Sequence, residues 1–455
     1  MSKLLAAVAA ASIAVVAHPA TRPATQPKVA GAEAVKSLTL ANGMKVIVWT
    51  DRDIPNVALY NWVRVGSRNE VPGITGLAHF FEHMMFNGTS KRAPGEFDRL
   101  MEAQGGSNNA FTSENVTVYQ DWIPRSALDM VFDLEADRLA NLSFDPQVVE
   151  SERGVVHSER RFAVEDDNEG FLTEQVQATA FVAHPYQIPT IGWPADIQSW
   201  KLEDLQNFYK THYAPNNCTL ILVGDISAEE GFALAKKYLE PIPRQEPPPA
   251  VRTTEPEQLG ERRLHVEREA QTPLLIQAYK SPAADDPMAP AIELLLSVLV
   301  EGNASRLNRL LVEEKKLAIQ VGGQFQEGFD PMLTWIQLTL PQGADVAAAE
   351  QALDAALAEV VEKGVTDAEL ARARNQFSSG FWKAIATIDG KARLLGEFEV
   401  FAGDHRKLFD APAVYEAVTR EDLRKAAARV FQKKHRTVGI LTPPAATPGA
   451  SGVRP

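Results

Sequence analysis

Residues 77–86 read Leu-Ala-His-Phe-Phe-Glu-His-Met-Met-Phe, and this stretch decides how the rest of the chain is interpreted. It contains neither Gly nor Pro, while Thr75 precedes it as a candidate N-cap and Gly88 follows it as a candidate stop, so it predicts a helix. Apolar side chains would cover nearly all sides of that helix, which predicts burial. Two His and one Glu in a buried helix need partners, because unpaired buried polar groups cost free energy.

The spacing of these polar residues favours a metal site. His79 and His83 stand four residues apart, so a helix brings both imidazoles to one face. Zinc suits imidazole and carboxylate ligands, and a catalytic zinc has three protein ligands and one open position. Glu82 lies beside the same face, where it can act as the general base without being a ligand. The alternative is a solvated helix with an exposed His pair, and the apolar flanks argue against it.

The third ligand must come from elsewhere, and a second predicted helix offers two carboxylates. Asp145 is a favoured N-cap and Pro146 a favoured first residue, so we expect a helix that runs to about Arg161. Glu152 and Glu159 stand seven residues apart on it and share one face. One of them can bind the metal while the other accepts a hydrogen bond from a ligating His. Their spacing does not decide which carboxylate has which role.

A Pro-rich segment divides the chain into two parts of similar length. Pro residues recur through residues 241–261 and interrupt both helix and strand there. We therefore predict a linker at 241–261, between an N-terminal metal-binding domain at 35–240 and a C-terminal domain at 262–445. Within the first part, residues 44–49 and 57–65 alternate apolar and polar residues as strands do.

The two parts end in similar patterns. Residues 202–205 begin a helical stretch that is followed by the apolar run 217–224, and residues 420–423 begin another that is followed by 436–441. A duplicated domain is the simplest explanation. We predict an α+β fold of two related domains, each a mostly antiparallel sheet with helices packed on it.

Composition excludes several classes of protein. The 455 residues are 45% hydrophobic and 23% charged, as in ordinary globular proteins, and the formal net charge is −13. An acidic chain of this kind is not expected to bind nucleic acid, which needs a basic surface. The one cysteine, Cys218, lies in an apolar run and is interpreted as a buried strand thiol rather than a nucleophile.

The N-terminus has the pattern of an export signal. Lys3 precedes an apolar run that ends in small residues near Ala17, which predicts a signal peptide at 1–17. A flexible leader at 18–34 and a tail at 446–455 are expected at the two ends. No later segment is apolar enough over about 20 residues to span a membrane. The mature protein is expected to be secreted, in the periplasm.

Residues 76–89, which contain the metal motif, resemble the metal-site helix of the pitrilysin/insulinase family of inverzincins. The resemblance is to its two-domain members of the mitochondrial-processing-peptidase type and covers about residues 38–443. It implies that Glu159 is the third ligand of one Zn²⁺ and that Glu152 supports a ligand. It also implies a zinc metalloendopeptidase that hydrolyses peptides or short unfolded segments. Further segments that resemble the family are Gly106–Ser113, His184–Tyr186 and Ile191–Trp193.

The family resemblance also implies the shape of the molecule and a place for the substrate. The two domains would form half of a clamshell around a chamber, and peptides would pair there with an edge strand. Asn109, Ala110 and Phe111 would lie on or near that edge. An ordinary strand after a Gly turn is the alternative interpretation of these three residues.

The chain departs from the family at one place. Active members carry an Arg and a Tyr, seven residues apart, that bind the substrate carbonyl, whereas this chain has Val312 and Ile319 at those positions. Neither side chain can donate a hydrogen bond. We therefore expect a heterodimer in which a homologous subunit supplies the Arg/Tyr pair. The alternatives are weak activity of this chain alone and a non-catalytic family member that acts as a binding or structural subunit.

Overall fold

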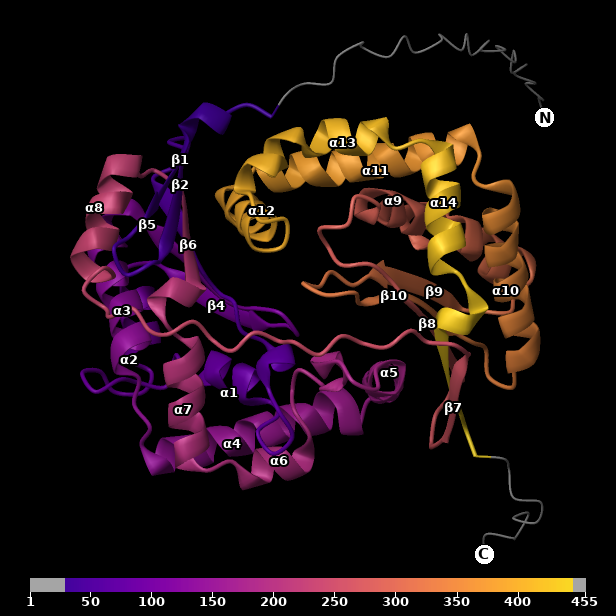
Figure 1. Cartoon of the computed structure of the whole chain (residues 1–455), viewed down its shortest axis with the longest axis horizontal. Helices are drawn as coiled ribbons and strands as arrows, with labels where there is room; N and C mark the ends of the chain where they lie inside the picture. The colour runs from indigo at the N-terminus through magenta and orange to yellow at the C-terminus, as the bar shows by residue number, and fades with distance from the viewer. Residues whose placement is uncertain (1–28, 445–455) are drawn as a thin grey trace, which may run out of the picture.

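The computed structural model describes residues 29–444, so the predicted signal peptide, most of the leader and the tail lie outside the described residues. It contains two β-sheets, one in each half of the chain. Figure 1 shows the first half on one side of the molecule and the second half on the other, with residues 241–261 running between them. Residues 244–260 form neither helix nor strand.

The first sheet has six strands in the order β1-β2-β6-β3-β5-β4, and the second has five in the order β7-β11-β8-β10-β9. The strands of the first sheet are β1 (Val35–Thr39), β2 (Lys45–Thr50), β3 (Asn56–Val63), β4 (Ser107–Thr112), β5 (Thr117–Pro124) and β6 (Cys218–Gly224). Those of the second sheet are β7 (Arg262–Glu267), β8 (Leu274–Lys280), β9 (Gln320–Phe325), β10 (Leu333–Thr339) and β11 (Arg436–Thr442).

The two sheets have the same topology apart from β1. Matched by position, β7 of the second sheet corresponds to β2 of the first, β11 to β6, β8 to β3, β10 to β5 and β9 to β4. In each half the last strand in the sequence forms a parallel pair, β6 with β2 and β11 with β7. The remaining pairs are antiparallel in both sheets. The prediction of an α+β fold with two related, mostly antiparallel sheets is confirmed.

Helices surround both sheets. The first half contains α1 (Leu77–Met84), α2 (Glu96–Ala103), α3 (Leu128–Asn141), α4 (Pro146–Arg160), α5 (Asn168–Ala180), α6 (Pro194–Ser199), α7 (Leu202–His212) and α8 (Ala228–Tyr238). The second half contains α9 (Ala289–Val300), α10 (Val346–Lys363), α11 (Asp367–Ile385), α12 (Ile388–Val400), α13 (Ala411–Ala417) and α14 (Arg420–Val430). Within residues 29–444, none of these helices combines the length and apolar character that a membrane span requires.

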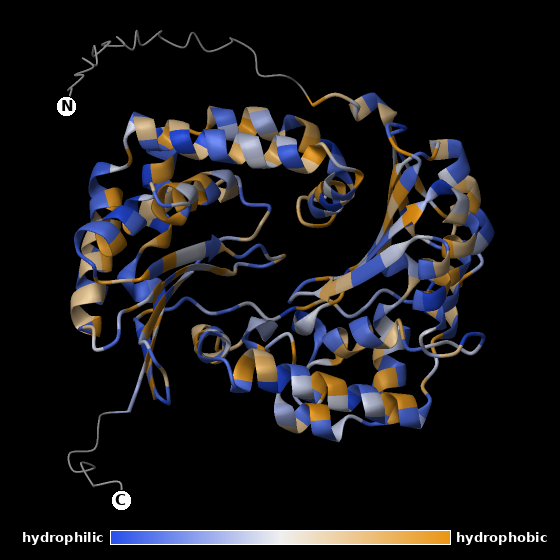
Figure 2. Ribbon diagram, turned by 180° about the vertical axis from the view of Figure 1, so that it is seen from behind, coloured by the Kyte–Doolittle hydropathy of each residue, from blue (hydrophilic) through white to orange (hydrophobic). Residues whose placement is uncertain are grey.

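Each sheet buries one face against helices of its own half. Along β3, Val57, Leu59 and Val63 point into a core that also contains side chains of α1, α3, α7 and α8. The second sheet packs in the same way against α9, α10 and α14. Figure 2 shows orange and blue residues alternating around most of these helices, as expected when one face is buried and the other is solvated.

The other face of each sheet is covered by a helix from the opposite half. The alternate residues of β3, which include Tyr60 and Trp62, pack against α12. Leu172 and Val176 of α5 pack against the second sheet in return. Figure 1 shows α12 beside the first sheet and α5 beside the second. This exchange buries both faces of the central strands and ties the two halves together, which the sequence did not predict.

α1 begins at Leu77 as expected, but its N-cap and its last residue differ from the sequence expectation. The N-cap position is Gly76, with φ of 87°, and not Thr75. The carboxylate of Glu70 accepts the backbone N–H groups of Gly76 and Ala78 at 2.7 Å each and so caps the helix from outside. Since α1 ends at Met84, Gly88 lies beyond the helix. Thr75 instead donates its hydroxyl proton to Asp196.

Candidate metal centre

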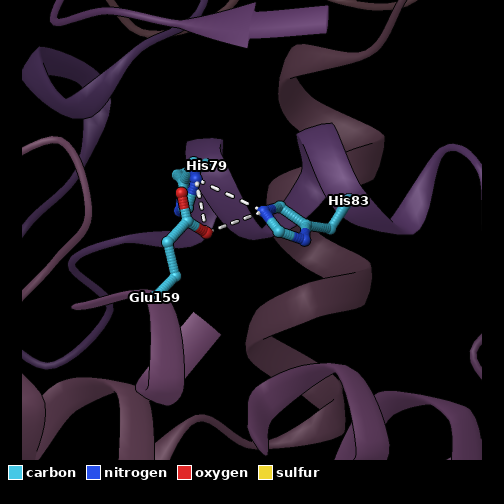
Figure 3. A group of neighbouring side chains, drawn as sticks. All are labelled: His79, His83 and Glu159. Carbon is cyan, nitrogen blue, oxygen red and sulfur yellow. Dashed lines mark hydrogen bonds and ion pairs between the residues drawn. The ribbon is translucent and has the colours of Figure 1, made fainter. Parts of the chain in front are cut away.

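Two helices bring the predicted ligands together. His79 and His83 lie on α1, and Glu159 lies in the last turn of α4, which packs against α1. Figure 3 shows the two imidazoles and the carboxylate pointing toward one another. α4 starts as expected, because the side chain of Asp145 accepts the backbone N–H groups of Gln147 and Val148.

The geometry of the three side chains fits a zinc ion. Nε2 of His79 lies 3.3 Å from Nε2 of His83, and Oε2 of Glu159 lies 3.5 Å and 3.3 Å from these two nitrogens. A tetrahedral zinc with bonds of about 2.0–2.1 Å places its ligands about 3.3–3.4 Å apart. One such atom from each residue lies within 4.8 Å of the others. The donor set and its spacing therefore match three of the four ligand positions of a tetrahedral zinc centre.

The second carboxylate of α4 holds one of the imidazoles. Oε1 of Glu152 lies 2.7 Å from Nδ1 of His83, on the side of the ring opposite to the ligand nitrogen. A carboxylate in this place fixes the orientation of the ring and leaves Nε2 free for a metal. The sequence spacing left the roles of the two carboxylates open. The structure brings Glu159 to the ligand nitrogens and Glu152 to the back of His83.

The ionisable side chains of this group shift one another's pKa values. Burial lowers the pKa of His83, but hydrogen bonds and charge interactions with Glu152 and Glu159 outweigh it and raise that pKa to about 9. Hydrogen bonds with His79 and His83 hold the pKa of Glu159 well below its usual value. Nδ1 of His79 is buried without a hydrogen-bond partner among the described residues. Protons and a metal ion would compete for the Nε2 atoms of His79 and His83.

Glu82 lies on α1 between the two His but is not among the converging ligand atoms. Its Oε2 accepts a hydrogen bond of 2.7 Å from the hydroxyl of Thr112, the last residue of β4. The sequence interpretation named three neighbours of Thr112 and missed Thr112 itself. Strand alternation is the signal that could have found it, because Thr112 shares a face with Ala110.

The three predicted substrate-binding residues lie on the edge strand of the first sheet. Asn109, Ala110 and Phe111 belong to β4, which pairs with β5 on one side and with no strand of residues 29–444 on the other. Asn109 and Phe111 are exposed, and Ala110 is half-buried. The free backbone groups of an edge strand can pair with an extended peptide.

Val312 and Ile319, the positions at which the sequence is expected to depart from the family pattern, lie in the second half. Val312 belongs to a π-helical segment, Asn308–Glu314, and is half-buried against the second core. Ile319 follows this segment and is 55% exposed. Cys218 is the first residue of β6, is buried, and has a thiol whose pKa is raised by burial, as expected for a structural side chain.

A polar cluster joins the two halves next to β4, and the sequence interpretation missed it. Arg68 of the first half forms an ion pair with Asp330 of the second half. His184 lies 3.2 Å from the same carboxylate, and burial lowers its pKa. These residues are separated widely in the sequence and have no local pattern, so only the tertiary structure shows their contact.

The comparisons with known proteins agree with this architecture. Residues 45–193 match the family described as insulinase (peptidase family M16), and residues 199–377 match the peptidase M16 inactive domain. The chain is 30% identical over 415 residues to the zinc protease PqqE of Helicobacter pylori, which covers 90% of this chain and 93% of the relative.

Solved structures share the fold. A protease from Helicobacter pylori superposes with a TM-score of 0.87 at 29% identity, over 90% of this chain and 99% of that one. The periplasmic protease PqqL of Escherichia coli superposes with a TM-score of 0.73 at 20% identity, over 92% of this chain but 48% of PqqL. The sequence matches and the shared two-domain fold lead to one conclusion: this chain belongs to peptidase family M16, the insulinase or pitrilysin family.

Proposed function

We propose that the chain is a zinc-dependent endopeptidase that hydrolyses peptides or short unfolded segments. The observation that carries this proposal is the convergence of His79, His83 and Glu159 at tetrahedral spacing, with Glu82 beside them. The names of the relatives support it, since the Helicobacter pylori relative is a zinc protease.

In the proposed reaction, His79, His83 and Glu159 hold one zinc ion. Bound zinc would polarise the scissile carbonyl and lower the pKa of a water molecule. Glu82 takes a proton from the attacking water and passes it to the amine that leaves. Glu152 keeps the ring of His83 oriented throughout, through the hydrogen bond of 2.7 Å.

The substrate would bind as an added strand. An extended peptide that pairs with the free edge of β4 would run past Asn109, Ala110 and Phe111. Thr112 at the end of this strand contacts Glu82, so a peptide paired with β4 would approach the base and the metal site. Backbone pairing gives affinity with little dependence on sequence, which suits a peptidase that acts on unfolded segments.

We propose further that a homologous subunit completes the active site. Val312 and Ile319 cannot bind a substrate carbonyl through a side-chain hydrogen bond, so an Arg/Tyr pair would come from the partner. The match to about half of PqqL supports a second, similar body. Peptide hydrolysis should appear only when this chain is mixed with that subunit, and full activity of this chain alone would contradict the heterodimer.

The N-terminal sequence is the basis for proposing the compartment in which the protein acts. Residues 1–17 have the pattern of a signal peptide, and a periplasmic protease shares the fold. We propose that the mature protein acts in the periplasm. Fractionation of cells that express the full chain would test this, because a cytoplasmic and unprocessed protein contradicts it.

The test of the catalytic proposal is Glu82→Gln. This variant should bind zinc as the wild type does, while kcat falls by about 10²–10⁴-fold, because Gln cannot accept the proton. Glu102→Gln is the matched control, since Glu102 is an exposed carboxylate on α2 and should leave kcat unchanged. Hydrolysis that persists in Glu82→Gln would show that the base has been assigned wrongly.

A non-catalytic binding or structural subunit is the other candidate function. Metal analysis of the purified protein separates the two candidates, because the binding subunit needs no zinc. The convergence of three ligand atoms favours the enzyme. A protein that contains no zinc after expression with zinc present would favour the binding subunit.

A further inference from the structure

The hydroxyl of Thr112 has two polar neighbours and only one proton to donate. Oε2 of Glu82 lies 2.7 Å away, and the hydroxyl oxygen of Thr117 lies 3.4 Å away. A carboxylate can only accept, and a hydrogen bond to a charged acceptor is stronger than one between neutral groups. The proton of Thr112 therefore points to Glu82.

The second neighbour is already occupied. Thr117 is buried and donates its own hydroxyl proton to the backbone carbonyl of Val65 at 3.0 Å. Its oxygen remains an acceptor, so it does not compete with Thr112 as a donor to Glu82. The hydroxyl of Thr112 on the edge strand is thus a hydrogen-bond donor to the carboxylate of Glu82.

The turn that follows Thr112 is held by contacts from both halves. Asn115, in the turn between β4 and β5, accepts hydrogen bonds from the hydroxyl of Tyr186 at 2.6 Å and from the backbone N–H of Phe329 at 3.1 Å. Glu114 in the same turn accepts a hydrogen bond from the side chain of Gln326 at 2.9 Å. The end of β4 is therefore held by the loop between β9 and β10, which belongs to the other sheet.

We propose that Thr112 is a positioning residue: its hydroxyl holds the carboxylate of Glu82 in the orientation that proton transfer requires. Because Thr112 is the last residue of β4, it also links a peptide bound along this strand to the base. This inference rests on the proposed function for its catalytic consequence. The hydrogen bond itself does not depend on that function.

Two substitutions separate the hydroxyl from the shape of the side chain. Thr112→Val keeps the volume and β-branching and removes the donor, so kcat should fall by about 10- to 100-fold while KM and zinc content change little. Thr112→Ser keeps the donor and should retain kcat within about threefold of wild type. A Val variant with full kcat, or a Ser variant as impaired as the Val variant, would overturn the positioning role.

A double-mutant cycle tests the same contact without activity. The melting temperature of the metal-free protein would be measured for wild type, Thr112→Val, Glu82→Ala and the double variant. If the two side chains interact, Thr112→Val should lower the melting temperature of wild type by about 2 °C more than that of the Glu82→Ala variant. Additive effects would overturn the proposal. A zinc-loaded wild type that hydrolyses no peptide, either alone or mixed with the homologous subunit, would remove the proposed function and leave the coupling intact.

Discussion

The two halves of this chain share one sheet topology but carry different side chains at matching positions. α1 follows β3 in the first half and α9 follows the matching strand β8 in the second half, which makes α9 the counterpart of α1. α1 presents His79, Glu82 and His83, whereas α9 is apolar and buried along most of its length, with Glu293 as its only acidic residue. This fold supplies a buried helix at a fixed place, and the side chains on that helix decide between a cluster of candidate metal ligands and a packed core.

A second difference lies at the ends of two matching helices. α7 and α14 precede the last strands, β6 and β11, and each is 11 residues long. The last residue is His212 in the first half and Val430 in the second, and both are buried. Burial lowers the pKa of His212 to about 4, so the first half buries an imidazole where the second half buries a hydrocarbon.

The largest expected effect comes from removing the proposed zinc ion from the first half. Treatment with a chelator, or the substitution His83→Ala, should abolish peptide hydrolysis. A chelator should also lower the free energy of unfolding of wild type by about 4 kcal/mol, if free zinc exceeded the dissociation constant a thousandfold beforehand. Melting curves with and without chelator measure this, and the His83→Ala variant should show no such shift.

Glu293→Gln on α9 is the matched control in the second half. Burial and the neighbouring Glu327 raise the pKa of Glu293 to about 8, so at neutral pH its carboxyl is mostly protonated and Gln is a close substitute. This variant should respond to the chelator as wild type does. A lost chelator response would show that the metal depends on the second half as well.

The next largest effect concerns the exchanged helices. Gly396 of α12 lies against the indole of Trp62 on β3, and a Cβ at this position would overlap the ring. Gly396→Ala should therefore destabilise the protein by about 3 kcal/mol through overpacking. Gly380→Ala on α11 is the control, because no atom lies within 4 Å of the added Cβ, and it should stabilise by about 0.5–1 kcal/mol. Chemical denaturation measures both, and equal effects would contradict the close packing of α12 on the first sheet.

The smallest expected effect is a pH dependence of the free energy of unfolding that arises from His212 in the first half. The unfolded chain binds a proton at His212 near pH 6.5, and the folded chain binds it only near pH 4, so stability falls as the pH is lowered between these values. From pH 7 to 5.5 this loss amounts to about 1 kcal/mol. His212→Val introduces the residue type found at the matching position, Val430, and should remove this loss of stability between pH 7 and 5.5. His265→Val, at an exposed position, should keep it.

Local patterns in the sequence were sufficient for much of the fold and the site. The helix that carries His79 and His83, the N-cap at Asp145 and the strands near residues 44–49 and 57–65 all follow from hydrophobic spacing and capping chemistry. Such features depend on residues within one or two turns of each other. The start of α1 at Leu77 was predicted correctly, but its N-cap was predicted wrongly, because the capping carboxylate is that of Glu70, which reaches the helix from an irregular segment.

By itself, the sequence determined that a buried helix carries two imidazoles four residues apart, and that the two halves repeat one pattern. The tertiary structure decided that Glu159 meets both imidazoles while Glu152 holds His83 from behind, which the family resemblance implied but equal helical spacing leaves open. It also decided that α5 and α12 exchange sheets and that Thr112 contacts Glu82. The physical reason is that periodicity records which face of an element is buried, whereas the partner of that face is fixed by packing between distant segments.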